Sequence, residues 1–181
     1  MRALVRELFK TIILSILVFM AMHISVQNYR VQGPSMQPTL VQGEYVIVNK
    51  LVYAFQPPQL GEVVVFQFPE DRSRDLVKRV IGVPGDTVSM KNGLVILNNA
   101  VLEEPYVTQG DSTTMPPITL GAGEFFVLGD NRQASNDSRN WGAVTFEDLI
   151  GRAWVKFWPV DKLNILSTAL FRDELFFWHR S

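Results

Sequence analysis

The chain has 181 residues, of which 47% are hydrophobic and 19% charged, so it can bury a core and is not disordered. Its net charge of −1 argues against a general nucleic-acid binder, which usually needs a basic face. Cysteine is absent, and the two histidines, His23 and His179, lie in an apolar N-terminal run and beside the C-terminus. Disulfides and a cysteine nucleophile are therefore excluded, a Ser-His-Asp triad and a zinc site are disfavoured, and we expect no metal and no cofactor.

The first part of the chain is almost entirely apolar from Leu8 to Val26, long enough for a helix of about the ~30 Å thickness of a membrane's hydrocarbon core. Its more strictly apolar part, Ile12 to Met22, would also suit a secretory signal. A removed signal needs small residues at alternate positions after this run, and no such pair is well placed here. We therefore predict a retained transmembrane anchor over residues 1–26, with a cleaved signal and a buried core helix as the alternatives.

Positive charge is concentrated before this apolar run. Arg30 alone follows it closely, whereas three cationic residues precede it, namely Arg2, Arg6 and Lys10. Because positively charged flanks stay in the cytoplasm, the N-terminus is predicted to be cytoplasmic and residues 27–181 to lie outside the cytoplasmic leaflet. The expected product is a single-pass protein of the cytoplasmic membrane, in contact with lipid.

Alternating and β-branched residues dominate the next part of the chain, in short runs separated by Gly, Pro and Asn, as in strands joined by turns. An Asn-Gly pair at Asn92-Gly93 is typical of a two-residue hairpin. We predict a mostly β fold, an antiparallel or mixed sheet over residues 27–86 and 122–160, with a smaller β lobe, residues 87–121, inserted in it. The expected strands are residues 45–48, 62–68, 76–81, 87–90, 94–97 and 124–128.

The last segment, residues 161–181, carries large apolar residues near helical spacing, and charged residues interrupt it, so it is too short to span a membrane. Two interpretations remain: a helix docked on the domain, or shallow insertion at the lipid interface.

A serine and a lysine stand out as candidate catalytic residues. Ser35 lies between two prolines, but a serine hydroxyl is a poor nucleophile until a base removes its proton. With histidine and cysteine disfavoured, lysine can serve if burial lowers its pKa. Lys78 lies in a strand rich in Val and Ile, and alternation places Arg79 on the opposite face, where we expect it to stay solvated while Lys78 points into an apolar cleft. The alternative is an ordinary edge-strand lysine.

A third stretch follows the expected strand 124–128 and is crowded with polar residues: Gly129-Asp130-Asn131-Arg132-Gln133-Ala134-Ser135-Asn136-Asp137-Ser138-Arg139. Most loops of this composition are simply solvated. Here Ser135 could hydrogen-bond the Lys78 amine and hold it towards Ser35. Asp137 and Arg139 could pair and brace the loop.

These three stretches resemble the type I signal peptidases, membrane-bound serine proteases that remove signal peptides from exported proteins. The resemblance runs in order from the anchor to about Arg139, which is most of the chain, and three linked motifs make it specific. The matching residues are Ser35-Met36-x-Pro38-Thr39, Lys78-Arg79-Val80-Ile81-Gly82-x-Pro84-Gly85-Asp86 and Gly129-Asp130-Asn131-Arg132-x-x-Ser135-x-Asp137-Ser138-Arg139.

The resemblance implies that Ser35 is the nucleophile and that Lys78 is the general base and later the general acid. It further implies that Ser135 positions Lys78 and that Asp137 and Arg139 form a structural pair. The implied fold is a mixed β-sheet domain with an inserted β lobe on a membrane anchor. The implied partners are signal peptides of exported preproteins, and we expect a monomer.

One position in this chain departs from some members of the family. Some members carry a serine two residues before the nucleophile, whose hydroxyl joins the oxyanion hole, whereas this chain has Gly33. We infer that the Ser35 N–H and a second donor near Gly33 supply the hole.

The resemblance also implies a substrate pocket. Shallow apolar pockets should accept small residues of an extended substrate. The residues that the resemblance places there are Tyr29, Val31, Met36, Leu40, Val46 and Val77.

Two other functions are compatible with parts of the sequence. Self-cleaving repressors use Ser-Lys chemistry in a similar β fold, but they are cytoplasmic and lack an anchor, so the N-terminal run disfavours them. A membrane-anchored β module that only binds partners is the non-enzymatic alternative, and it would tolerate changes at Ser35 and Lys78.

Overall fold

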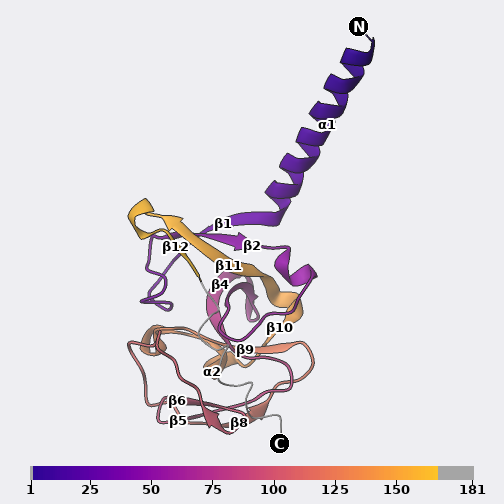
Figure 1. The fold of residues 1–181 in the computed structure, drawn as a ribbon. Coiled ribbons are helices and arrows are strands. Elements are labelled where there is room, and N and C mark those ends of the chain that lie inside the picture. Colours follow the sequence, from indigo (N-terminus) through magenta and orange to yellow (C-terminus); the bar gives the residue numbers. More distant parts are fainter. Residues whose placement is uncertain (1, 167–181) are drawn as a thin grey trace, which may run out of the picture.

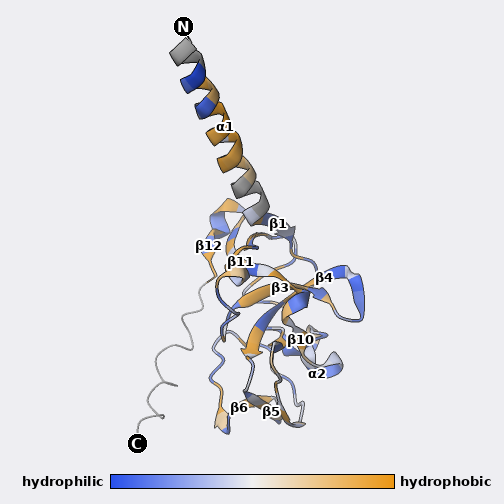
Figure 2. Cartoon of the chain, turned by 90° about the vertical axis from the view of Figure 1, so that its right-hand side faces the viewer, coloured by the Kyte–Doolittle hydropathy of each residue, from blue (hydrophilic) through white to orange (hydrophobic). Residues whose placement is uncertain are grey.

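The computed structural model describes residues 2–166. The chain begins with α1, Arg2–Ser25, which projects away from a body made almost entirely of strands (Figure 1). The middle of α1 is hydrophobic (Figure 2). Its side chains Phe9, Leu14 and Leu17 are exposed.

The expectation of a membrane-spanning anchor is not met. Within residues 2–166, the structure contains no helix with the length and apolar content that crossing a membrane requires.

A large antiparallel sheet forms most of the body. Its strands follow the order β1-β2-β11-β3-β4-β9-β10, and the short β12 pairs with β11. Their bounds are β1 Val26–Arg30, β2 Tyr45–Asn49, β3 Val63–Phe68, β4 Asp71–Gly82, β9 Glu124–Leu128, β10 Val144–Thr145, β11 Leu149–Trp158 and β12 Asn164–Ile165.

A smaller antiparallel sheet lies at the end of the body opposite α1 (Figure 1). Asn92 and Gly93 both have positive φ, 49° and 80°, as a two-residue hairpin turn between β5 and β6 requires. The order is β7-β6-β5-β8, with β5 Thr87–Lys91, β6 Leu94–Leu97, β7 Ala100–Val101 and β8 Met115–Thr119. The prediction of a mostly β fold is thus confirmed.

Short helical turns connect the strands. Two of them, η2 Arg132–Ala134 and α2 Ser138–Trp141, lie in the polar stretch that follows β9. The others are η1 Val52–Ala54, η3 Phe146–Asp148 and η4 Val160–Lys162.

Residues 161–166, for which a docked helix and shallow insertion at the lipid interface were the two interpretations, do not form an α-helix. Pro159 and the turn η4 precede β12, whose Ile165 and Asn164 pair with Val155 and Lys156 of β11, so this stretch extends the sheet. The rest of the predicted segment, residues 167–181, lies outside the described residues.

Buried side chains join the two sheets at β4 and β9. Val80 and Phe125 belong to the core of the large sheet, whereas Ile81 and Phe126, the next residue of each strand, pack with Val88 of the small sheet. Alternation along a strand sends successive side chains to opposite faces, so β4 and β9 contribute to both cores. The middle of β4 therefore lies where the two cores meet, beside the candidate site.

Candidate active site

Ser35 lies in the loop that connects β1 to β2. Two buried apolar side chains, Met36 and Leu40, fix this loop onto the core, and Leu40 N donates to Met36 O at 2.8 Å. Gly33 has φ +79°, a left-handed conformation that glycine adopts most easily, and this favours Gly over Ser at that position. The Ser35 carbonyl accepts a hydrogen bond from Asn131 N at 3.0 Å.

Lys78 reaches Ser35 from the middle of β4. Its Nζ lies 3.0 Å from Ser35 Oγ and 3.0 Å from the carbonyl oxygen of Val77. The Lys78 side chain is buried, with 3% of the residue exposed, and burial lowers its pKa to about 8, although the charges of Asp137 and Asp130 act in the opposite direction.

This geometry gives the pair its chemistry. With a pKa of about 8, roughly a tenth of the Lys78 amine is uncharged at pH 7, against about one part in 2,500 for an ordinary lysine. The ammonium form donates to Ser35 Oγ, whereas the uncharged form can accept the hydroxyl proton across the same 3.0 Å. The site therefore contains a serine within reach of a base.

Arg79 corrects one expectation. It does lie beside Lys78 on β4, but it is buried, with 4% exposed, and is not solvated. Its guanidinium donates twice to Asp130, from Nε to Oδ1 at 2.8 Å and from Nη2 to Oδ2 at 2.7 Å. Burial opposes the positive charge, but the hydrogen bonds and charge of Asp130 outweigh it and raise the pKa of Arg79 above its ordinary value.

Asp130 also links Arg79 to the nucleophile loop. Thr39 Oγ1 donates to Asp130 Oδ2 at 2.5 Å, and Arg79 Nη2 donates to Thr39 Oγ1 at 3.2 Å. Thr39, Arg79 and Asp130 belong to three different sequence motifs, and no role is predicted for Thr39 or Asp130 from the sequence. Only the fold brings the three residues together.

The structure brings Asp137 and Arg139 together. Arg139 Nε donates to Asp137 Oδ1 at 2.7 Å, and Nη2 donates to Oδ2 at 2.8 Å. Asp137 is fully buried and also accepts from the backbone N–H of Gly129 at 3.0 Å. Arg139 further donates to the carbonyl oxygens of Arg132 and Ser135 at 2.8 and 3.2 Å, so the pair ties both ends of the polar loop together.

Ser135 does not make the expected hydrogen bond to Lys78. Its Oγ is buried and has no hydrogen-bond partner among the described residues. It lies against Gly129, where an added Cβ would collide with Ser135 Oγ and with the carbonyl oxygen of Ser35. Gly129 thus permits the close approach of these three residues, although the structure forms no bond from Ser135 to the amine.

A pocket of about 400 Å³ opens beside Ser35 and Lys78. Its lining includes the end of β1 and residues 73–78 of β4. Four of the six predicted residues line it, namely Tyr29, Val31, Val46 and Val77. Met36 and Leu40 do not, because both are buried in the core beneath the loop.

The pocket also has polar lining residues that the sequence does not predict. Asp75 accepts a hydrogen bond from Tyr29, and burial together with the charge of Asp75 raises the pKa of Tyr29 to about 12. Val65 and Leu76 add apolar surface, while four polar residues complete the lining: Arg30, Gln32, Ser73 and Arg74. The charged run 70–75 has the composition of a solvated hairpin, which does not indicate that its end enters the pocket.

Comparison with known proteins identifies the family. The family model described as "Signal peptidase, peptidase S26" matches residues 5–158. The chain belongs to the signal peptidases. The predicted resemblance is confirmed, and with it the activity, cleavage of signal peptides by a serine endopeptidase.

Individual relatives agree with this assignment. Signal peptidase I of Leptolyngbya laminosa is 39% identical over 165 residues, covering 87% of this chain and 81% of the relative. The probable signal peptidase I-1 of Synechocystis sp. is 37% identical over 148 residues, covering 78% and 76%. Signal peptidase I of Bacillus caldolyticus is 38% identical over 151 residues, covering 73% and 79%. Signal peptidases are membrane-associated enzymes.

Proposed function

We propose that Ser35 is the nucleophile and Lys78 the general base of this serine endopeptidase. The observation that carries the proposal is the 3.0 Å contact between Ser35 Oγ and a buried amine whose pKa is lowered. The uncharged Nζ takes the hydroxyl proton as Oγ bonds to the carbonyl carbon of the scissile peptide. The resulting ammonium then protonates the leaving amine, and Nζ, uncharged again, activates the water that hydrolyses the acyl-enzyme.

The oxyanion of the tetrahedral intermediate would be held by the backbone N–H of Ser35 and a second donor near Gly33. A missing donor typically reduces the rate by about 10²–10³-fold, so two donors are expected. The left-handed φ of Gly33 supports this arrangement, because a serine would be strained there.

The pocket supports recognition of an extended peptide with small residues before the scissile bond. Val31, Val46 and Val77 offer shallow apolar contacts, and the end of β1 and residues 73–78 both line the opening, so an extended substrate can add as a strand beside them. We propose that Ser135 and the Asp137–Arg139 pair support this machinery from behind. Since nucleophile, base and pocket come from one chain, a monomer is expected to suffice.

We also propose where the enzyme works. Signal peptides of exported preproteins emerge at the outer face of the cytoplasmic membrane, and the domain would lie there, attached to lipid through α1. The exposed apolar side chains of α1, including Phe9 at 65% and Leu14 at 63%, support this attachment. Replacing both by serine should weaken binding to lipid vesicles, and unchanged binding would contradict it. We further propose that residues 87–121 are a lobe inserted between the two halves of the catalytic core.

The test of the catalytic proposal is preprotein cleavage by Ser35→Ala and Lys78→Met. Each variant should lose cleavage by at least about 10³-fold, because each removes one partner of the proton transfer. Circular dichroism should show that both remain folded, and Gln42→Ala, an exposed change in the same loop, is the matched control. Normal processing by either variant would overturn the proposal.

A further inference from the structure

A segment outside the large sheet packs against the polar loop that follows β9. This segment, residues 104–111, connects β7 to β8 and is called the strap below. The polar loop, residues 129–139, is called the catalytic loop because it carries Ser135, Asp137 and Arg139. Two ion pairs and several backbone contacts join the strap to the catalytic loop.

The first ion pair joins Glu104 to Arg132. Arg132 Nη2 donates to Glu104 Oε1, and the Arg132 side chain is fully buried while that of Glu104 is 9% exposed. The same Glu104 oxygen accepts from Tyr106 OH at 2.7 Å. Arg132 Nε in turn donates to the carbonyl oxygen of Gly129 at 3.0 Å, so the pair reaches the start of the catalytic loop.

The second ion pair joins Asp111 to Arg139. Arg139 Nη1 donates to Asp111 Oδ2 at 2.6 Å, while its other nitrogens bind Asp137. Arg139 is therefore held between a carboxylate of its own loop and one of the strap. The fork geometry of a guanidinium accommodates two such carboxylate partners.

Between the two ion pairs, the catalytic loop donates hydrogen bonds to backbone carbonyl oxygens of the strap. Arg132 N donates to Gln109 O at 3.1 Å, and Gln133 Nε2 donates to Gly110 O at 2.8 Å. Gln109 also forms a parallel bridge with Asn131. Asn131 N donates to Ser35 O on the other side, so the catalytic loop lies between the strap and the nucleophile.

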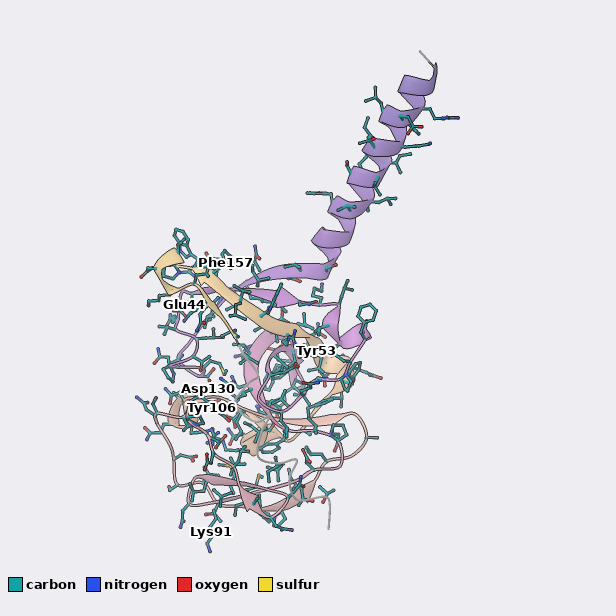
Figure 3. All side chains as sticks on the ribbon, in the orientation of Figure 1. Glu44, Tyr53, Lys91, Tyr106, Asp130 and Phe157 are labelled. Carbon is teal, nitrogen blue, oxygen red and sulfur yellow. The ribbon has the colours of Figure 1, made fainter. Side chains whose placement is uncertain are left out.

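The strap also covers the cation that neighbours Lys78 on β4. The ring of Tyr106 lies 4.0 Å from the guanidinium carbon of Arg79, which binds Asp130. Tyr106 and Asp130 lie close together in the region between the two sheets (Figure 3). Asp130 is the second residue of the catalytic loop, which the strap holds.

From these contacts we infer that the strap positions the catalytic loop against Ser35 and Lys78, and that Glu104 and Asp111 are positioning residues for peptide cleavage. The inference rests on the proposed roles of Ser35 and Lys78. In this inference, the small sheet, to which the strap belongs, supports catalysis although it does not contact the substrate. Neither Glu104 nor Asp111 lines the pocket, so their loss should affect turnover and not substrate binding.

The test compares Glu104→Gln and Asp111→Asn with wild type in a steady-state cleavage assay. We expect kcat per folded molecule to fall at least fivefold while KM stays within twofold. Hydrogen exchange at Asn131 N–H should speed up at least tenfold, since that bond to Ser35 O depends on the held loop. Asp111→Asn should also move the acid limb of the kcat profile to lower pH.

The direction of that pH change follows from the charges facing Lys78, which are Asp137, Asp130 and Arg139. Removing the negative charge of Asp111 leaves Arg139 less neutralised, and this disfavours the ammonium form of Lys78. A loss of folded protein alone would not move the profile.

The matched control is Asp148→Asn, which removes a buried carboxylate whose partners, Arg72 at 3.0 Å and Thr145, belong neither to the strap nor to the catalytic loop. It should destabilise the fold without changing kcat per folded molecule or the pH profile.

If Asp111→Asn does not fold, Gln133→Ala, an exposed change, should still raise exchange at Asn131 and lower kcat about twofold. Unchanged exchange and kcat in all foldable variants would overturn the inference. If Lys78→Met instead keeps the activity of the wild type, the proposed mechanism is overturned. The two failures are therefore distinguishable.

Discussion

Lys78 and Arg79 are adjacent cations on β4, equally buried, yet their surroundings are opposite. Arg79 has a buried carboxylate, a carbonyl oxygen, a hydroxyl and an aromatic ring around its guanidinium. Lys78 has one hydroxyl and one carbonyl oxygen within hydrogen-bond distance, and its nearest carboxylates act through space. The pKa of Arg79 is therefore raised, whereas that of Lys78 is lowered.

The contrast teaches that burial alone does not make a lysine into a base. Burial penalises charge at both positions, and what differs is whether a carboxylate compensates. On one face of β4 the fold keeps a fixed cation as a structural tie, and on the other it leaves an amine free to lose its proton.

The largest expected effect comes from placing an arginine on both faces of β4, at position 78 as well as at position 79. Lys78→Arg places a group that stays protonated at any accessible pH beside Ser35 Oγ. The cleavage rate should fall by about 10³-fold or more, because the base that activates Ser35 is removed. Single-turnover cleavage of a preprotein measures this, and a fall of less than tenfold would show that Lys78 is not the base.

The next effect is on stability, and its sign should differ between the two residues. Arg79→Met leaves buried Asp130 unpaired and should lower the free energy of unfolding by about 3–5 kcal/mol. Lys78→Met removes an amine whose protonation the fold opposes, and should raise it by up to about 3 kcal/mol at pH 7. Urea unfolding of both variants checks the signs. Arg72→Met is the control, because its guanidinium is mostly exposed and should contribute under about 1 kcal/mol.

The pH dependence follows from the same amine. Its uncharged form is the active one, so the rate should rise about tenfold per pH unit below pH 7 and level off above about pH 8. Stability follows with a sign set by the lowered pKa: between pH 8 and 10.5 the unfolded chain binds more protons, so the free energy of unfolding rises with pH in that window. A flat rate profile from pH 6 to 9 would count against Lys78 as the base.

The smallest effect is expected at Ser135. Its hydroxyl is buried without a partner among the described residues, so Ser135→Ala should change the free energy of unfolding by under about 1 kcal/mol. The rate should nevertheless fall about tenfold, because the ammonium formed during the reaction needs an acceptor that this hydroxyl can supply. Parallel unfolding and cleavage measurements test this, and an unchanged rate would assign Ser135 a packing role only.

Much of the fold was predictable from local patterns, and the failures have physical causes. The runs at 62–68 and 124–128 alternate or are continuously apolar, and both are strands. β11 was not predicted, because Gly151 and register shifts interrupt its pattern, while its partners β2 and β3 lie far away in the sequence.

The candidate site was predictable where the motif residues act in pairs. Ser35 and Lys78 are 43 positions apart but meet at 3.0 Å. The environment of Arg79 was not predictable, because Asp130 and Tyr106 reach it from other parts of the chain. The pocket residues were predictable only in part, for a similar reason. A residue type shows that a side chain is apolar, but it does not show whether the side chain faces the core, as Met36 does, or the pocket, as Val31 does.

The hydrogen bond from Asn131 N to Ser35 O has a thermodynamic consequence. It fixes the backbone direction at Ser35 before any peptide arrives, so little ordering of the enzyme remains to be done on the way to the transition state. The chemical step should accordingly show a small activation entropy, with most of its barrier in enthalpy.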